Sequence, residues 1–239
     1  MTDAGFRVAD LDSRSLAKQT SRLLIIPIGA LEAHGPQNPL GADSIQAEVT
    51  AAELAPKVGA LVAPPLSYGV CPGAAQFPGT VTIRMSTMAL LVEEVVAQFA
   101  RVGFRRILLL SGHGSMQHMA ALREGGQRAM AHYPTLKVAA LCDYDYVYEL
   151  RGKEAPASDG HGGFLETSRL MALVPDLVGP ERPAAQLTTS RYALHTPTRE
   201  EWPESVIGDT QGSSAEAGRR IQAHVLDRLQ RLVQEVLPE

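Results

Sequence analysis

The sequence predicts an α/β fold with a mainly parallel central sheet. Short continuous apolar runs bounded by Gly and Pro are typical of strands buried on both faces. Longer segments with the periodicity of amphipathic helices lie between them. Because the two kinds of segment alternate, we expect parallel strands joined by helices. With 239 residues and no internal repeat, the chain is expected to form one domain over residues 1–239.

The apolar runs predict five strands. The first lies between Arg22 and Gly29 and reads Leu-Leu-Ile-Ile-Pro-Ile. The five strands are expected at residues 22–29, 60–66, 79–84, 105–110 and 137–141.

Five helices are predicted between and after these strands. Asp43 and Gln46 resemble a capping box with Asp43 as N-cap, so a helix is expected from there to about Lys57. Ser86 is expected to cap a second helix that runs to about Val102. Its buried stripe is expected to contain Leu90, Leu91, Val95, Phe99 and Val102. The remaining helices are expected before Pro134 (with Met119, Leu122 and Met130), at 164–173, and at 215–237 (with Ile221, Val225, Leu229, Leu232 and Val236).

The composition argues against several classes of protein. A net charge of −4 provides no basic field for nucleic acid, and an aromatic content of 5% argues against base stacking. No apolar run approaches the roughly 20 residues that span a bilayer, and the N-terminus lacks the features of a secretory signal. Two cysteines, Cys71 and Cys142, suit a reducing compartment. We therefore expect a cytoplasmic protein that binds neither nucleic acid nor membranes.

Candidate metal ligands follow two of the predicted strands. Glu32 and His34 come after the first strand, and His113 follows the strand at 105–110. Ligands of open α/β sheets bind beyond the carboxyl ends of the strands. Asp43 begins a helix, and the Gly/Pro-rich loop before it could fold back toward His34. Mixed carboxylate and imidazole ligation suits Zn, Mn or Fe rather than Ca.

Each of these residues also has a purely structural interpretation. Asp43 could cap its helix, His113 could be a buried histidine bonded to the backbone, and Glu32 and His34 could be solvated loop residues. The metal-site interpretation is favoured because all four residues belong to the two strand ends where such folds bind ligands.

A third polar segment runs from Asp159 to Ser168. Glu166 falls in the first turn of the predicted helix, where a carboxylate also complements the helix dipole. His161 lies in a glycine-flanked loop with no core to pack into. The segment therefore offers two more candidates, with a structural alternative open for Glu166.

A thiol nucleophile is the competing catalytic hypothesis. Cys71 lies in a Gly/Pro loop near a strand end. No His or Asp has a spacing that pairs it with this thiol, and free cysteines are usually small buried hydrophobes. We therefore favour metal chemistry over Cys71.

Five motifs in register resemble the creatininase (creatinine amidohydrolase) family. They are Glu32–Asp43 (Glu-x-His-Gly-Pro, then Pro-Leu-x-x-Asp), Phe77–Thr80, Gly112–Gly114, His161–Ser168 and Gly208–Arg219. The resemblance implies a three-layer α/β/α sandwich, two divalent metal ions per chain (Zn, Mn or Fe) and a homohexamer. The metal ligands it implies are Glu32, His34, Asp43 as the bridge, and His113. Glu166 is expected as fifth ligand, because Ser115 stands where creatininase has a ligand Glu, and His161 matches the catalytic histidine.

Two departures from the family pattern concern the substrate. Gln37 and Asn38 interrupt the usual His-Gly-Pro-His-Leu-Pro motif, and Ala74 replaces a His that many relatives carry before Phe77. We expect Gln37, Cys71, Gln76 and Ser115 to contact the substrate, and creatinine not to be that substrate.

The sequence thus predicts a metal-dependent hydrolase that cleaves a non-peptide C–N bond of a small amide or cyclic amide. A metal-activated water would attack the amide carbon while His161 protonates the leaving nitrogen. The alternatives are a formamide hydrolase, a relative that trims short peptides, and a metal-binding oligomer without turnover.

Overall fold

Four parallel strands form the central sheet of the computed structural model, which describes residues 6–190, 192 and 194–238. Their order across the sheet is β2-β1-β3-β4. The strands are β1 (Leu24–Ile28), β2 (Leu61–Val62), β3 (Arg106–Ser111) and β4 (Lys137–Cys142). A separate antiparallel pair joins β5 (Ala184–Ala185) to β6 (Gly208–Asp209). The predicted α/β class and parallel central sheet are therefore confirmed.

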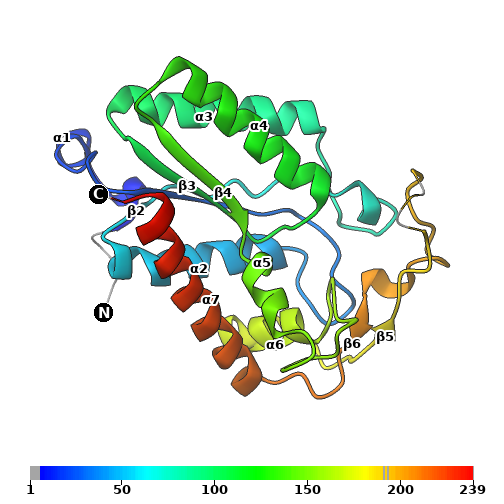
Figure 1. Ribbon diagram of the computed structural model, residues 1–239. Coiled ribbons are helices and arrows are strands. Elements are labelled where there is room, and N and C mark those ends of the chain that lie inside the picture. The colour runs from blue at the N-terminus through cyan, green and yellow to red at the C-terminus, as the bar shows by residue number, and fades with distance from the viewer. Residues whose placement is uncertain (1–5, 191, 193, 239) are drawn as a thin grey trace.

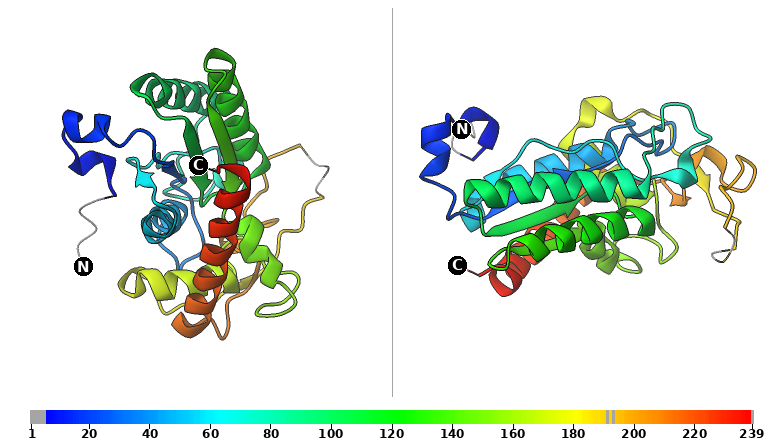
Figure 2. Two further views of the ribbon diagram at one scale, coloured as in Figure 1. Left: turned by 60° about the vertical axis from the view of Figure 1, so that its left-hand side comes forward. Right: turned by 90° about the horizontal axis from the view of Figure 1, so that it is seen from above.

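Helices cover both faces of the sheet (Figure 1), which gives the three layers expected. The longer helices are α2 (Ala42–Val58), α3 (Met85–Val102), α4 (Met116–His132), α6 (Phe164–Leu173) and α7 (Ala215–Val236). Two short helices are α1 (Ser13–Ala17) and α5 (Tyr144–Val147). Single 3-10 turns occur at Val8–Asp10, Pro72–Ala74, Tyr148–Leu150, Pro175–Leu177 and Pro203–Ser205. Helices α3 and α4 run side by side on one face (Figure 2), while α2, α6 and α7 pack on the other.

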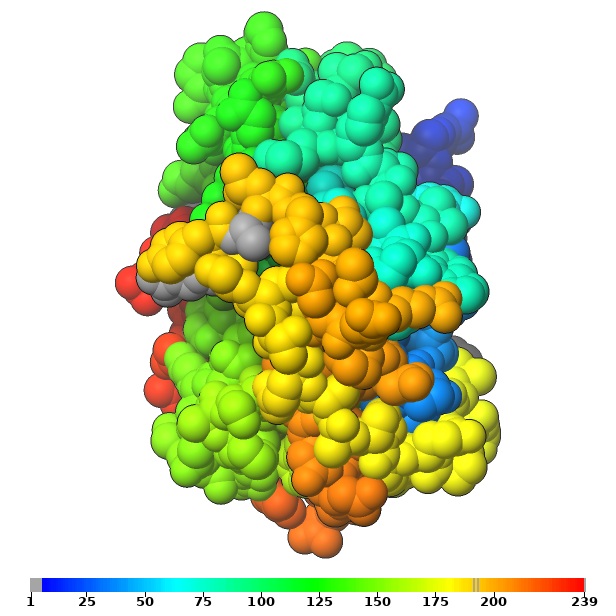
Figure 3. All heavy atoms as spheres, turned by 90° about the vertical axis from the view of Figure 1, so that its right-hand side faces the viewer, coloured from blue at the N-terminus to red at the C-terminus, as the bar shows by residue number. Residues whose placement is uncertain are grey.

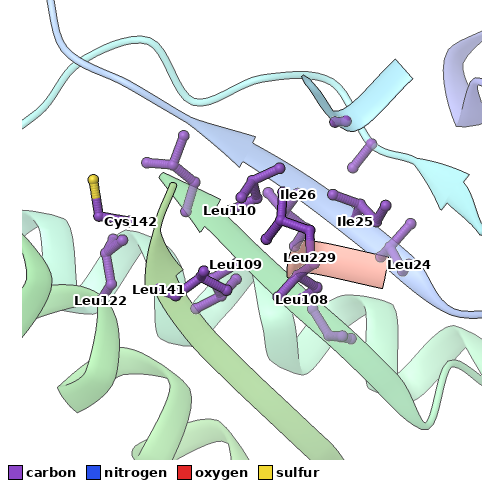
Figure 4. Packing of buried hydrophobic residues seen from close by; sticks show 14 of the residues in the cluster. Leu24, Ile25, Ile26, Leu108, Leu109, Leu110, Leu122, Leu141, Cys142 and Leu229 are labelled. Atoms are coloured by element: carbon purple, nitrogen blue, oxygen red, sulfur yellow. The ribbon is translucent and has the colours of Figure 1, made fainter. Parts of the chain in front are cut away.

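The core lies where the strands meet both helical layers. All five residues of β1 are buried, which is why its sequence is apolar without alternation. Figure 4 shows Ile25 and Ile26 of β1 beside Leu108 of β3 and Leu229 of α7. No helix among the described residues is long and apolar enough to cross a membrane.

The predicted strand at 79–84 is wrong, and the one at 60–66 is too long. Val81 and Thr82 make only single bridges, to Leu31 and Gly69, in loops beyond the strand ends. Strand β2 stops at Val62, and Pro64 and Pro65 follow shortly after it. Because proline has no amide hydrogen, the ladder cannot continue through that segment.

The stripe predicted for α3 is only partly right, because Val95 and Phe99 pack against the core but the other three residues are exposed. Leu90 is 51% exposed and Val102 43% exposed. The residues that α3 buries are Met88, Ala89, Val92, Val96 and Ala100. Most of them are small because α3 approaches α4 closely at Gly125, where a side chain would collide with the Ala89 carbonyl. The exposed Leu90, Leu91 and Val102 show that large apolar residues alone do not mark the buried face of this helix.

Candidate metal centre

Two glycines allow the start of α2 to lie against the ends of β1 and β3. A Cβ at Gly29 would collide with the backbone of Ser44, and a Cβ at Gly112 with the carbonyl of Asp43. The loop between β1 and α2 folds back, since the Glu32 N–H donates to the Leu40 carbonyl over 3.0 Å. This close approach brings Asp43 between residues that follow two neighbouring strands.

Asp43 does not cap its helix. Helix α2 begins at Ala42 with Gly41 as N-cap, so Asp43 lies inside the first turn and the predicted cap is wrong. Its carboxylate is buried and faces two imidazoles. Oδ1 lies 3.1 Å from Nε2 of His34, and Oδ2 lies 3.1 Å from Nδ1 of His113. One carboxylate thus joins the groups that follow β1 and β3.

Glu32, Asp43 and His113 form the first group of candidate ligands. The Nδ1 atom of His113 is 3.0 Å from Glu32 Oε2. Both Glu32 Oε2 and Asp43 Oδ2 are buried without a hydrogen-bond partner in the described part of the chain. His113 Nε2 lies 3.1 Å from the Val70 carbonyl. Because a carbonyl only accepts, Nε2 carries the proton of the neutral ring and Nδ1 presents its lone pair to the carboxylates.

His34, Asp43 and Glu166 form the second group. His34 Nδ1 donates to the Glu32 carbonyl over 2.9 Å, which leaves the Nε2 lone pair directed at the cluster. Nε2 is 3.5 Å from Glu166 Oε1. Donor atoms that share one ion at about 2.0–2.1 Å lie about 3.0–3.4 Å apart. The separations of 3.0 and 3.1 Å in the first group fall within this range, those of 3.1 and 3.5 Å in the second lie within or just above it, and Asp43 belongs to both groups.

A buried network orients Glu166. Its Oε2 accepts from the Gly162 N–H over 2.7 Å, and its Oε1 accepts from Gln46 Nε2 over 3.1 Å. The Gln46 Oε1 atom accepts from Tyr144 (2.7 Å) and from Arg169 (3.3 Å). With those donors on its oxygen, the amide must turn its NH₂ toward Glu166. Sequence reasoning missed the roles of Gln46, Tyr144 and Arg169; the available signal was a charged Arg169 about one turn after Glu166 in the mainly apolar helix predicted at 164–173.

The cluster strongly attracts positive charge. Burial alone would lower the pKa of His34, but Asp43 and Glu166 outweigh burial and raise it to about 10. The pKa of His113 is likewise raised well above its usual value, because Glu32 and Asp43 outweigh the effect of its burial. The negative potential that would hold protons on these rings is the same potential that would hold metal cations there.

His161 stacks on His34, with ring centroids 4.1 Å apart, and meets the edge of Trp202. Its Nε2 donates to the Ala33 carbonyl over 2.8 Å, so the neutral ring presents Nδ1 as its lone pair. Burial, followed by the charge on His34, lowers its pKa. Candidate ligand atoms of Glu32, His34 and His161 also lie within 4.8 Å of one another. His161 is therefore a neutral base directly beside the cluster.

A cavity of about 1030 Å³ opens from the cluster. Figure 3 views this end of the molecule, where the segment between β5 and β6 (yellow to orange) crosses the face. Cys71, Ser115 and Trp202 line the cavity, as do the ligand groups. The cavity wall thus includes two of the four residues predicted to contact substrate.

Gln37 and Gln76 do not line the cavity, so their prediction as substrate contacts is not supported. Gln37 is buried and donates to the Gly162 carbonyl (2.8 Å) and to Thr167 (3.2 Å), which ties its loop to the start of α6. Gln76 lies in the loop before Phe77, and its carbonyl accepts from Arg199. Gln37 therefore supports a loop beside the site, whereas the side-chain amide of Gln76 is buried without a hydrogen-bond partner in the described part of the chain.

The two predicted contacts that do line the cavity have limited chemistry. Ser115 donates to the Val70 carbonyl over 2.7 Å and accepts from the His118 N–H at the start of α4, so its hydroxyl is already engaged. Burial, followed by the charge of Glu32, raises the pKa of Cys71 to about 12. The thiol is therefore protonated at neutral pH, which argues against Cys71 as nucleophile.

Fold and site together define an α/β protein with a buried candidate centre for two cations beyond the carboxyl ends of its strands. The family model described as "Creatininase: Creatinine amidohydrolase" matches residues 9–233. The chain belongs to the creatininase family and is a hydrolase of that family.

Three characterised relatives illustrate the range of the family. Creatinine amidohydrolase of Pseudomonas putida is 32% identical over 177 residues, which cover 67% of each chain. A 3-dehydro-scyllo-inosose hydrolase of Thermotoga maritima is 26% identical and covers 90% of this chain and 78% of its own. A mycofactocin precursor peptide peptidase of Mycolicibacterium smegmatis is 29% identical, and the match covers 87% of this chain and 85% of the peptidase.

Solved structures agree over nearly the whole chain. A crystal structure of creatinine amidohydrolase superposes with a TM-score of 0.89 at 25% identity, covering 98% of both chains. A creatininase variant of the Zn-Zn type gives a TM-score of 0.88 at 26% identity, with the same coverage. The Mn form of creatininase gives 0.89 at 25% identity, covering 98% of this chain and 99% of its own.

Proposed function

We propose that this protein uses two divalent metal ions to hydrolyse the C–N bond of a small amide or cyclic amide. The observation that carries the proposal is the position of Asp43, whose two oxygens face two different imidazole nitrogens. The proposed ligands are Glu32, His34, Asp43, His113 and Glu166, with Asp43 shared. Ser115 is not included, because its hydroxyl is engaged by Val70 and His118.

The chemistry of the donor set fits Zn, Mn or Fe. Glu32, Asp43 and Glu166 contribute three negative charges when ionised, and two divalent ions contribute four positive charges. Without metal, protons on His34 and His113 offset part of this negative charge, and divalent ions would take the place of those protons. The Zn-Zn and Mn forms of related creatininases support the same choice of ions.

Bound in this way, divalent ions supply a water of lowered pKa and a Lewis acid for the substrate carbonyl. The protein's own contribution to proton transfer is assigned to His161. Its Nδ1 is free to accept a proton from the attacking water, and it then donates that proton to the leaving nitrogen. The Ala33 carbonyl keeps the other ring nitrogen protonated throughout, and Trp202 covers one edge of the ring.

One experiment separates the candidate functions. The purified protein is analysed for Zn, Mn and Fe, reconstituted with each ion, and assayed on lactams, formamides, short linear amides and short peptides. Metal binding with turnover of lactams or small amides supports the proposal. Turnover confined to formamides or peptides supports the alternative hydrolases. Metal binding without turnover on any of these substrates indicates a binding protein, and absence of metal after reconstitution refutes all of them.

Peptide trimming is the second candidate function. The cavity of about 1030 Å³ lies at the upper end of the range for small-molecule sites, and the peptidase from M. smegmatis is a relative over most of the chain.

We also propose a homo-oligomer, a hexamer by resemblance to the family, and a cytoplasmic location. Light scattering of the metal-loaded protein tests the oligomer, and cell fractionation tests the location.

A further inference from the structure

Arg151 is a feature of the cavity wall that the proposed reaction does not use. It follows the 3-10 turn Tyr148–Leu150 and lines the same cavity as the proposed metal ligands. Its guanidinium lies over the Tyr148 ring, with Cζ 3.3 Å from the ring centroid. Stacking on an aromatic ring holds this planar group in a defined orientation. The cavity therefore contains a fixed positive charge.

This charge forms no ion pair within the described residues, although it partly offsets the rise that burial causes in the pKa of Asp159. The Nε atom of Arg151 is buried without a hydrogen-bond partner, and its Nη atoms make no hydrogen bond or ion pair in the same part of the chain. Asp159, on the same wall, is engaged: its two oxygens accept from the backbone N–H groups of Phe164 (2.7 Å) and Leu165 (3.1 Å). Asp145 also lines the cavity and forms no ion pair with Arg151. A buried donor in this state is stabilised by any ligand that supplies an acceptor.

We propose that Arg151 binds a carboxylate of the substrate, so that the natural substrate is an amide with a free carboxylate group away from the scissile bond. The identity of the scissile bond rests on the proposed function above. Nε–H and one Nη–H of a guanidinium form a parallel pair of donors that matches the two oxygens of a carboxylate. In Arg151 neither Nε nor the Nη atoms have an acceptor among the described residues.

The geometry favours a carboxylate over a phosphate. One planar guanidinium matches a planar monoanion, whereas a phosphate is usually bound by several donors or by a helix N-terminus. The helix starts on this wall already have acceptors: Asp159 accepts from N–H groups of α6, and Ser115 accepts from the His118 N–H of α4. The cavity volume of about 1030 Å³ leaves space for a substrate that reaches from the metal ligands to Arg151.

The test compares amides that differ only in this group. The metal-loaded enzyme is assayed on N-acetylglycine and N-acetylglycinamide, glutaramate and glutaramide, and 5-oxoproline and its carboxamide. We expect kcat/KM to favour the carboxylate member of the hydrolysed pairs by at least about tenfold. Arg151→Gln is expected to remove the preference mainly by raising KM, and Arg151→Lys to retain part of it, because lysine keeps the charge without the fork. Arg128→Gln, which alters an exposed arginine of α4 outside the cavity wall, is the control.

A binding measurement gives a second readout that needs no turnover. Trp202 is the chain's one tryptophan and lines the cavity, so its fluorescence reports ligand binding. Hexanoate is expected to bind the metal-loaded protein more tightly than hexanamide, and Arg151→Gln to lose that difference. Equal kcat/KM within the pairs, or hexanoate binding that survives in Arg151→Gln, overturns the role of Arg151 and leaves amide hydrolysis standing. Absence of turnover on every amide refutes the proposed function. The fluorescence measurement with hexanoate and hexanamide then decides the role of Arg151 alone.

Discussion

Asp43 Oδ2 and His113 Nδ1 lie 3.1 Å apart, yet this oxygen has no hydrogen-bond partner among the described residues. When His113 is neutral, its proton lies on Nε2 and is donated to the Val70 carbonyl, so two electron-pair donors face each other in a buried site. That arrangement is unfavourable unless a proton, which the raised pKa of His113 favours, or a metal cation lies between them. The same relationship links Asp43 to His34 on its other side, which makes Asp43 the residue on which both proposed metal positions depend.

Asp43→Asn is therefore expected to reduce metal content from about two ions per chain to well below one. The substitution keeps the shape of the side chain but removes the charge shared by both groups. Elemental analysis after dialysis measures the outcome. Asp176→Asn, at an exposed position outside the cavity, is the control. Retention of both ions in Asp43→Asn would show that Asp43 is not the bridge.

His161→Ala is expected to keep the metal content and to lower kcat by about 10²–10⁴-fold, the usual contribution of a general acid–base residue. The reason is its position beside His34 rather than between the carboxylates. Elemental analysis and steady-state kinetics on the best amide substrate are measured on the same preparation. If His161→Ala loses an ion as readily as Asp43→Asn, His161 is a ligand and the proton carrier must be another residue.

Gln46→Leu is expected to weaken metal binding by about 10–100-fold, the usual effect of losing a residue that orients a ligand. The change removes the donor to Glu166 Oε1 and leaves the carboxylate itself in place. Competition with a chelator measures the affinity. Thr50→Val is the matched control, because Thr50 accepts from Arg169 in the same network without contacting Glu166. Equal affinities of Gln46→Leu and the wild type would contradict an orienting role.

Glu166→Gln is expected to lose about one ion per chain, and Ser115→Ala none. The Glu166 carboxylate faces His34 in the second group, whereas Ser115 caps α4. Ser115→Ala should instead cost about 1 kcal/mol of stability through the lost cap. Elemental analysis and thermal unfolding are the two measurements. Loss of an ion in Ser115→Ala, with none lost in Glu166→Gln, would reverse the assignment of the fifth ligand.

The sequence predicted best those features that depend on local pattern. The strand at Leu24–Ile28 was predicted because burial on both faces leaves a continuous apolar run, and Glu32 and His34 were found because they follow it. The role of Asp43 was misjudged in part, since a first-turn Asp and an N-cap Asp differ by one or two positions in sequence. The buried face of α3 was missed because its packing depends on Gly125, which is distant in sequence.

Features that depend on contacts between distant segments were beyond sequence reasoning. Gln46 reaches Glu166 across 120 positions of the chain, and no local pattern connects them. Gln37 and Gln76 were expected at the substrate because they lie near motifs, but neither is among the residues that line the cavity. Arg151 has no motif at all, and its importance depends on the Tyr148 ring beneath it and on the absence of an ion pair among the described residues.

Creatinine is expected to be a poor substrate even for the fully metal-loaded enzyme. Cys71, Ser115 and Arg151 line this cavity. By the motif comparison, Ser115 stands where creatininase has a ligand Glu. Creatinine lacks a carboxylate for Arg151. A substrate that leaves a polar group of the site unmatched can have a kcat/KM lower by up to about 10⁴-fold. The comparison is kcat/KM for creatinine against N-acetylglycine, glutaramate and 5-oxoproline under identical metal loading. Creatinine hydrolysis above about 10⁴ M⁻¹s⁻¹ would contradict the prediction, whereas a carboxylate-bearing amide hydrolysed at least tenfold better than creatinine would support it.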